Sequence, residues 1–309
     1  DGAAPTPVTF TKLATFLSLW CRRNRTDGIA NKIYHIKKMV SAEDYLPTEQ
    51  DERDFAMFRA GIRKFDNRSA RPKEAIRTRH LLEMVDSMKA SGTWATTQND
   101  LKRASEWCML LLQQQGMLRT AELLNEIKVK DIEIKMNAAT GRLFMVVDIH
   151  RSKMNKHGPA ETVVFGEADS DNSELCAVTW VRRLLELRGL DERRTEHQHA
   201  KLFVRWWTEG GVTAPAKMGW TKALWVKVVK SFAKLTKSLS NVAGHSARAG
   251  GATDALRSGE TPHMVMLQGR WKQLSSLLLY DRWTIEERAD SAARWLEVAR
   301  RHASDPRAG

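Results

Sequence analysis

Apolar side chains recur at helical spacing in the first part of the chain. A stripe that returns every three or four residues is typical of a helix that buries one face in a core. We therefore predict three helices before residue 66, with their lysines and arginines facing outward. The apolar stripes are Leu13, Phe16, Leu17 and Trp20; Ile29, Ile33, Ile36 and Val40; and Phe55, Phe58, Ile62 and Phe65.

The middle of the chain has a β pattern. Residues 131–134, 143–149 and 161–165 are rich in β-forming side chains, and a basic segment, 150–158, joins the last two runs. These runs predict a three-stranded antiparallel sheet with a basic hairpin loop. The expected fold class is mainly α with a small antiparallel β-sheet. The other predicted helices are 81–88, 101–115, 119–127, 175–188, 221–237, 246–258, 262–268, 274–280 and 285–302.

The charge balance favours a polyanionic partner. The 309 residues include 50 lysines and arginines against 37 aspartates and glutamates, a formal net charge of +13 at pH 7. A cation that meets a phosphate releases a condensed counterion, so this excess favours nucleic acid. Hydrophobic residues make up 42% of the chain, which indicates folded domains rather than a disordered polymer.

A basic segment without apolar periodicity separates two predicted domains. We expect a helical domain at 1–70, an exposed linker at 71–79 that lies near a phosphate backbone, and a mixed α/β domain at 80–309. An ordinary basic loop is the alternative interpretation of the linker. The cations expected to contact a nucleic acid are Arg68, Arg71, Lys73 and Arg77 around the linker, with Arg151 and Lys156 in the hairpin.

The cysteines and apolar runs bear on the compartment. Cys21, Cys108 and Cys176 are odd in number and far apart, so neither a disulfide framework nor a zinc finger is expected. A reducing intracellular compartment fits best, either a bacterial cytoplasm and nucleoid or a eukaryotic nucleus. No apolar run approaches the roughly 20 residues that span a bilayer, so we expect no membrane partner.

Two short motifs place a cation beside a second polar group near a predicted helix start. Arg119 and Glu122 lie three residues apart, so they share a helix face. His245 and Arg248 have the same spacing, and the small residues at 249–252 permit close backbone approach. Alone, each motif has an ordinary explanation: a surface ion pair for the first and a structural histidine for the second.

A third motif holds Trp271 and Tyr280, the one tyrosine in the C-terminal half of the chain. In order, the motifs give Arg119, a hairpin lysine, His245-x-x-Arg248, Trp271 and Tyr280. This ordered set resembles the tyrosine recombinase (phage integrase) family. The resemblance implies an α-helical core-binding domain and a mixed α/β catalytic domain that clamp double-stranded DNA. It also implies strand cleavage and rejoining through a covalent 3′-phosphotyrosine, with no metal, cofactor or ATP.

The resemblance assigns roles that suit the chemistry of each side chain. Tyr280 is the implied nucleophile. Arg119 and Arg248 are the implied phosphate clamps, because a guanidinium presents parallel N–H donors. Trp271 can only donate from its indole N–H, and His245 can donate or take the tyrosine proton.

The remaining implied roles concern the hairpin, the support of Arg119 and the C-terminus. Lys153 is the implied acid that protonates the leaving 5′ oxygen, with Lys156 in reserve, and Glu122 is implied to orient Arg119. The predicted helix at 285–302 is implied to dock into a neighbouring protomer, giving a homotetramer on two DNA sites. Packing of this helix on its own domain is the alternative.

Three other functions remain open from the sequence. A type IB topoisomerase or telomere resolvase would use the same active-site chemistry without exchanging two sites. A DNA-binding protein descended from a recombinase would form no covalent adduct. A metal-dependent nuclease would need a carboxylate cluster; the nearest imitation, at 196–199, fits a solvated loop better. For a recombinase, the resemblance leaves integration, excision and resolution of a mobile element open as roles.

Overall fold

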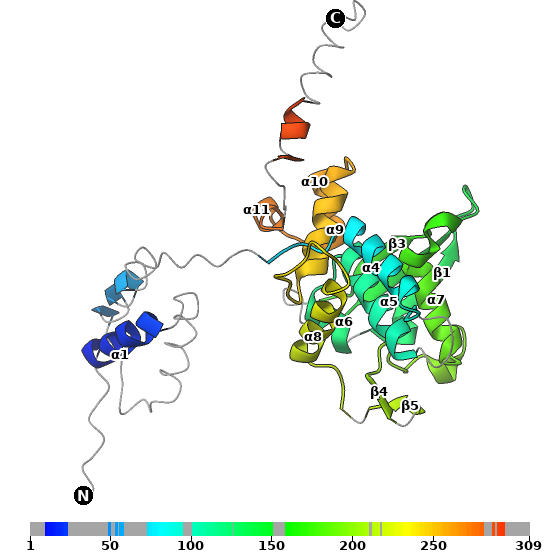
Figure 1. Cartoon of the computed structure of the whole chain (residues 1–309), viewed down its shortest axis with the longest axis horizontal. Helices are drawn as coiled ribbons and strands as arrows, with labels where there is room; N and C mark the ends of the chain where they lie inside the picture. The colour runs from blue at the N-terminus through cyan, green and yellow to red at the C-terminus, as the bar shows by residue number, and fades with distance from the viewer. Residues whose placement is uncertain are drawn as a thin grey trace, which may run out of the picture. The chain divides into compact units, whose positions relative to one another are not determined.

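The computed structural model divides the chain into two compact units, Asp1–Pro72 and Lys73–Gly309 (Figure 1). The residues it describes are 10–23, 49–50, 53–54, 56–58, 73–94, 101–125, 127–150, 158–209, 212–216, 218–280, 286–287 and 289–293.

The first unit begins with helix α1 (Phe10–Arg23), as predicted. Leu13 and Leu17 are buried one turn apart, whereas Phe16 is 51% exposed. The prediction that Phe16 belongs to the core is wrong, because it lies about 100° around the helix from Leu17. The predicted stripe at 29–40 lies outside the described residues. Of the third stripe the structure describes only Phe58, which is helical, as are residues 53–54 and 56–57 beside it.

The second unit has the predicted mixture of helices and a small sheet, and two short elements that the sequence pattern did not reveal. These are the strands β4 and β5, which pair as a hairpin between the helices predicted at 175–188 and 221–237. The elements in order are α4 (Thr78–Ala90), α5 (Leu101–Gln115), α6 (Thr120–Asn125), η3 (Val129–Asp131), β1 (Ile132–Met136), β2 (Leu143–Ile149), β3 (Glu161–Gly166), η4 (Ser170–Leu175), α7 (Ala177–Leu187), η5 (Thr195–His197), β4 (Trp206–Glu209), β5 (Val212–Pro215), α8 (Lys222–Ala233), α9 (Ser246–Arg257), α10 (Pro262–Gly269) and α11 (Leu274–Leu278), the η elements being 3₁₀ helices.

The sheet confirms the predicted antiparallel arrangement, with strand order β1-β2-β3. Val147 in β2 pairs with Ile132 on one side and Val163 on the other, and all three are buried. At the far end, Ile149 pairs with Glu161, so these two residues close the base of the hairpin. The structure describes the hairpin loop, 150–160, only at its two ends, residue 150 and residues 158–160.

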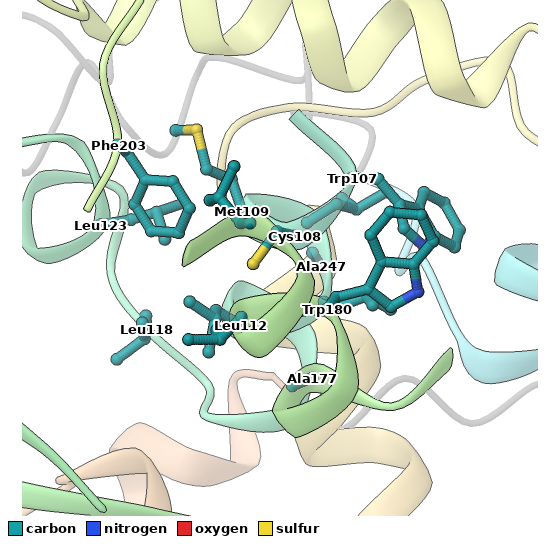
Figure 2. Packing of buried hydrophobic residues seen from close by; sticks show 14 of the residues in the cluster. Trp107, Cys108, Met109, Leu112, Leu118, Leu123, Ala177, Trp180, Phe203 and Ala247 are labelled. Atoms are coloured by element: carbon teal, nitrogen blue, oxygen red, sulfur yellow. The ribbon is translucent and has the colours of Figure 1, made fainter. Parts of the chain in front are cut away.

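Helix α5 forms the centre of the second unit. Its side chains from Ala104 to Gln114 are all buried, so it is covered on every side. Figure 2 shows this core, with Trp107 and Trp180 together on one flank of the cluster. Both indole N–H groups donate to the carbonyl of Glu174, at 3.0 and 2.9 Å, which satisfies two buried donors with one acceptor.

Helix α9 packs against its neighbours through glycines, as the small residues of its motif predicted. A Cβ on Gly251 would lie 1.8 Å from the Gln114 carbonyl oxygen, and one on Gly250 would lie 1.7 Å from that of Ile76. Only glycine permits these approaches. α9 is thereby held against α5 on one side and against the chain entering α4 on the other.

In the described part of the expected linker, residues 73–79, Lys73, Thr78 and Arg79 are exposed as expected, but Ala75 and Ile76 are buried. Ile76 is fully buried, and its N–H donates to the Ser246 carbonyl at 2.9 Å. Thr78 already belongs to α4. Ala75 and Ile76 are apolar, and Gly250 leaves room for the backbone of Ile76, so these two residues pack on α9 while both ends of the segment stay exposed.

Among the described residues, no helix combines the length and apolar character needed to cross a membrane.

Candidate active site

The start of α6 holds the first predicted pair together. The Glu122 carboxylate accepts from the Arg119 backbone N–H and from its Nη1, both at 2.7 Å. Glu122 is 1% exposed, whereas Arg119 keeps 18% of its side chain accessible. The carboxylate therefore caps the helix start and fixes the Arg119 guanidinium, which faces the surface of the site.

The start of α9 holds the second predicted pair. The Gly244 carbonyl accepts from Thr120 Oγ1 at 2.9 Å, which brings His245 beside the start of α6. Arg248, one turn into α9, is completely buried. Its Nη1 donates to the Met117 carbonyl and its Nη2 to the Gly269 carbonyl, the latter at 2.8 Å.

Trp271 and Tyr280 lie against Arg248. The Arg248 guanidinium is 4.0 Å from the centre of the Trp271 ring and 5.4 Å from that of Tyr280. The two rings are 5.2 Å apart and tilted by 53°. These distances are within the range of cation–π and aromatic contacts. A Cβ on Gly269 would lie 1.7 Å from Trp271, so this glycine makes room for the indole.

Arg270, which the sequence analysis did not single out, is also part of the cluster. Its backbone is left-handed (φ 56°, ψ 46°), a conformation that costs a non-glycine residue about 1–2 kcal/mol. Its side chain is 4% exposed and forms an ion pair with Glu122 at 2.5 Å. The available signal was an arginine directly after the glycine that ends α10, where a left-handed residue is common.

The site carries more positive than negative charge. Burial, and then the charges of Arg119 and Arg270, lowers the pKa of Arg248 to about 9, so it keeps its proton at neutral pH. Burial alone would raise the pKa of Glu122, but the charge of Arg270 and hydrogen bonds from Arg119 outweigh it and lower that pKa. Partial desolvation, and then the charge of Arg248, lowers the pKa of His245.

The structure therefore brings together six of the seven residues predicted for catalysis: Arg119, Glu122, His245, Arg248, Trp271 and Tyr280. The seventh, Lys153, lies outside the described residues, as do Arg68, Arg71, Arg151 and Lys156. The other two cations expected at DNA are engaged within the protein. Lys73 donates to Asn241 at 2.5 Å, and Arg77 pairs with Asp254 at 2.8 Å and with Glu287 at 2.7 Å.

No grouping of three or more histidine, cysteine or acidic side chains suited to a metal occurs in the described part of the chain. The arrangement that does occur gathers guanidiniums, an imidazole and an indole beside a phenol. Such donors suit an anionic group such as a phosphate.

No family model matches the sequence, and no curated protein matches it. Among solved structures, the Tn1549 transposon integrase in complex with circular intermediate DNA is similar, with a TM-score of 0.51 at 12% identity over 94% of this chain and 87% of that one. XerA recombinase is 13% identical, with a TM-score of 0.47 over 92% of this chain and 97% of that one. XerH site-specific recombinase, bound to its palindromic difH substrate, is 16% identical, with a TM-score of 0.46 over 74% of this chain.

These comparisons concern the fold. The chain spans 56% and 64% of the length of the two XerH chains it matches. The similarity to the transposon integrase extends over nearly the whole of both chains. The protein has an integrase fold, mainly α with a small antiparallel sheet.

Proposed function

We propose that this chain is a tyrosine recombinase: a site-specific DNA recombinase that cuts and rejoins strands through a covalent 3′-phosphotyrosine. One observation carries the proposal. The phenol of Tyr280, the only tyrosine in the second unit, lies with Trp271 against the buried Arg248, and Arg119 lies at the same site. The integrase fold supports it.

In the proposed reaction, Tyr280 Oη attacks phosphorus and the bond from phosphorus to the 5′ oxygen breaks. The phenol proton passes to His245, whose lowered pKa favours the neutral, proton-accepting form. Lys153 protonates the leaving 5′ oxygen. Arg119, Arg248 and the Trp271 N–H stabilise the charge on the non-bridging oxygens, each donor being worth about 3–4 kcal/mol. The reverse step, attack by a 5′ hydroxyl on the phosphotyrosine, rejoins the strand without ATP.

The finer features of the proposal rest on motif and charge. The Gly-His-Ser-Ala-Arg pentapeptide and the spacing of Trp271 to Tyr280 resemble those of Cre recombinase. We propose that Arg68, Arg71, Lys73, Arg77, Arg151 and Lys156 contact the DNA backbone, with Lys73 and Arg77 first released from their contacts within the protein. We also propose that the segment at 285–302 docks into a neighbouring protomer, so that four copies act on two DNA sites inside the cell.

Replacing the nucleophile tests the proposal directly. The substrate is a pool of randomised duplexes that each carry a nick. After cleavage the short end diffuses away, so the strand cannot be rejoined and the protein stays attached to the DNA. Wild type is expected to form a covalent adduct that survives denaturing electrophoresis and EDTA. Tyr280→Phe is expected to form none while its affinity for the same pool changes by less than about 3-fold. Tyr45→Phe, the matched change elsewhere in the chain, is expected to behave as wild type.

Two results would favour other functions. Adduct formed by Tyr280→Phe would remove the assigned nucleophile, and no adduct from wild type would leave a DNA-binding protein. The trapped sequences then allow a second assay with two differently labelled sites. Recombinant product indicates a recombinase, whereas adduct without exchange indicates a topoisomerase or telomere resolvase.

A further inference from the structure

Arg270 is a buried arginine to which the proposed reaction gives no role. It follows the last residue of α10, and its side chain points inward with 4% exposure. A buried cation is retained only where partners compensate the loss of water. The partners of Arg270 therefore indicate what it does.

The first partner is the carboxylate that holds Arg119. Arg270 Nη2 donates to Glu122 Oε2, and Arg119 Nη1 donates to the other carboxylate oxygen at 2.7 Å. Arg119 Nη2 in turn donates to the backbone carbonyl of Arg270 at 3.3 Å. The three residues form a closed loop, so Arg270 holds the Arg119 guanidinium both through Glu122 and through its own backbone.

The second partner lies at the base of the β2–β3 hairpin. Arg270 Nε is 3.7 Å from Oε2 of Glu161, the first residue of β3. Both atoms are buried and neither has a hydrogen-bond partner among the described residues, so this ion pair is the compensation that the described residues supply. Glu161 pairs with Ile149 where the hairpin loop leaves the sheet, and that loop carries Lys153 and Lys156.

We propose that Arg270 is a positioning residue: its contacts fix Arg119 and the base of the β2–β3 hairpin relative to each other. The inference rests on the proposed recombinase function, since it concerns the alignment of the phosphate clamp with the hairpin acid. Only a guanidinium serves here, because Arg270 also donates from Nη1 to the Gly116 and Gln268 carbonyls, at 3.4 and 3.1 Å. A lysine offers one donor centre and cannot reach all these acceptors.

The test compares Arg270→Lys with wild type on the nicked duplex pool. Arg270→Lys is expected to form adduct about 10- to 100-fold more slowly, with affinity for the pool within about 3-fold of wild type. Arg142→Lys, the same change at the exposed pair of Arg142 with Asp169, is expected to keep the wild-type rate. A folded Arg270→Lys protein with the wild-type rate overturns this inference alone. Absence of adduct from wild type overturns the proposed function and the inference with it.

A second variant separates positioning from a general structural role, and decides the matter if Arg270→Lys does not fold. Glu161→Gln removes only the hairpin contact and is expected to slow adduct formation about 10-fold. A duplex with sulfur at the bridging 5′ position has a leaving group of pKa about 8.5, which needs no acid. On this substrate Glu161→Gln is expected to recover to within about 3-fold of wild type. A Glu161→Gln defect that sulfur does not rescue, or no defect at all, overturns the hairpin link.

Discussion

The buried charge of Arg248 is covered by two aromatic rings. The Arg248 side chain is inaccessible to solvent, and the rings of Trp271 and Tyr280 lie over its guanidinium. A DNA phosphate that binds Arg248 therefore has to displace at least one ring. Tyr280 is the ring that the reaction itself would move, because its oxygen must reach phosphorus.

His245 predicts the pH dependence of adduct formation. Its pKa lies below the ordinary 6.5, so at pH 6.5 the neutral imidazole predominates and the protonated form gains only in more acidic solution. We expect the rate of adduct formation to fall as the pH drops below 6.5. The pH–rate profile of wild type on the nicked duplex pool measures this.

The matched variant for this pH dependence is His245→Asn, which keeps a hydrogen-bond donor but does not titrate. Its rate should be lower throughout, without the acid limb. An unchanged acid limb in His245→Asn would assign the titration to another group. The stability effect has its own sign: the unfolded chain binds this proton more readily, so His245 lowers folding stability as the pH falls below 6.5.

At the residue scale, the sequence predicts contacts that are local and misses those between distant segments. The three-residue spacing of Arg119 and Glu122 implies that they touch, and they do. The contact between Glu122 and Arg270 joins residues 148 positions apart, and neither helical nor strand periodicity carries information about it. Arg270 was overlooked for that reason, although it lies next to Trp271.

The glycines of α9 set how closely the helices around the site approach. Gly251→Ala adds a Cβ that would overlap the Gln114 carbonyl, a clash with backbone that costs about 3 kcal/mol or more. The gain in helix propensity, about 1 kcal/mol, does not offset it. We expect Gly251→Ala to lower the free energy of unfolding by about 2 kcal/mol, measured by denaturant titration.

Gly166→Ala is the control for that prediction, because nothing lies within 4 Å of the added Cβ. It is expected to change the free energy of unfolding by less than about 0.5 kcal/mol. Equal effects of the two substitutions would show that backbone entropy, and not the close approach of α5 and α9, determines the result.

At the element scale, long amphipathic stretches are predictable and short pairings are not. α5 and the three-stranded sheet lie where their periodicity placed them. The β4–β5 hairpin was not predicted, because each strand has only four residues and the pairing of the two strands leaves no periodic pattern in the sequence. The burial of Ala75 and Ile76 was missed, because the three charged residues around them made the segment 73–77 look like an exposed loop.

At the scale of the whole molecule, the chain carries a net charge of +13, and the site in the second unit likewise has more arginines than carboxylates. The structure divides the chain after Pro72, within the segment where apolar periodicity is lost. The integrase fold places the three arginines of the site directly before α6, on α9 and directly after α10, in segments far apart in sequence. The excess charge of the chain and that of the site therefore favour the same kind of ligand.

The surplus of guanidiniums over carboxylates at the site also makes the protein's melting temperature a reporter of anion occupancy. A ligand that binds only the folded state stabilises it by about 2.7 kcal/mol at 100 times its dissociation constant. Sulfate, which has the size and geometry of a phosphate group, should therefore raise the melting temperature above that in chloride of equal ionic strength. Arg119→Gln should lose most of this increment; an undiminished increment would mean that sulfate stabilises the fold elsewhere.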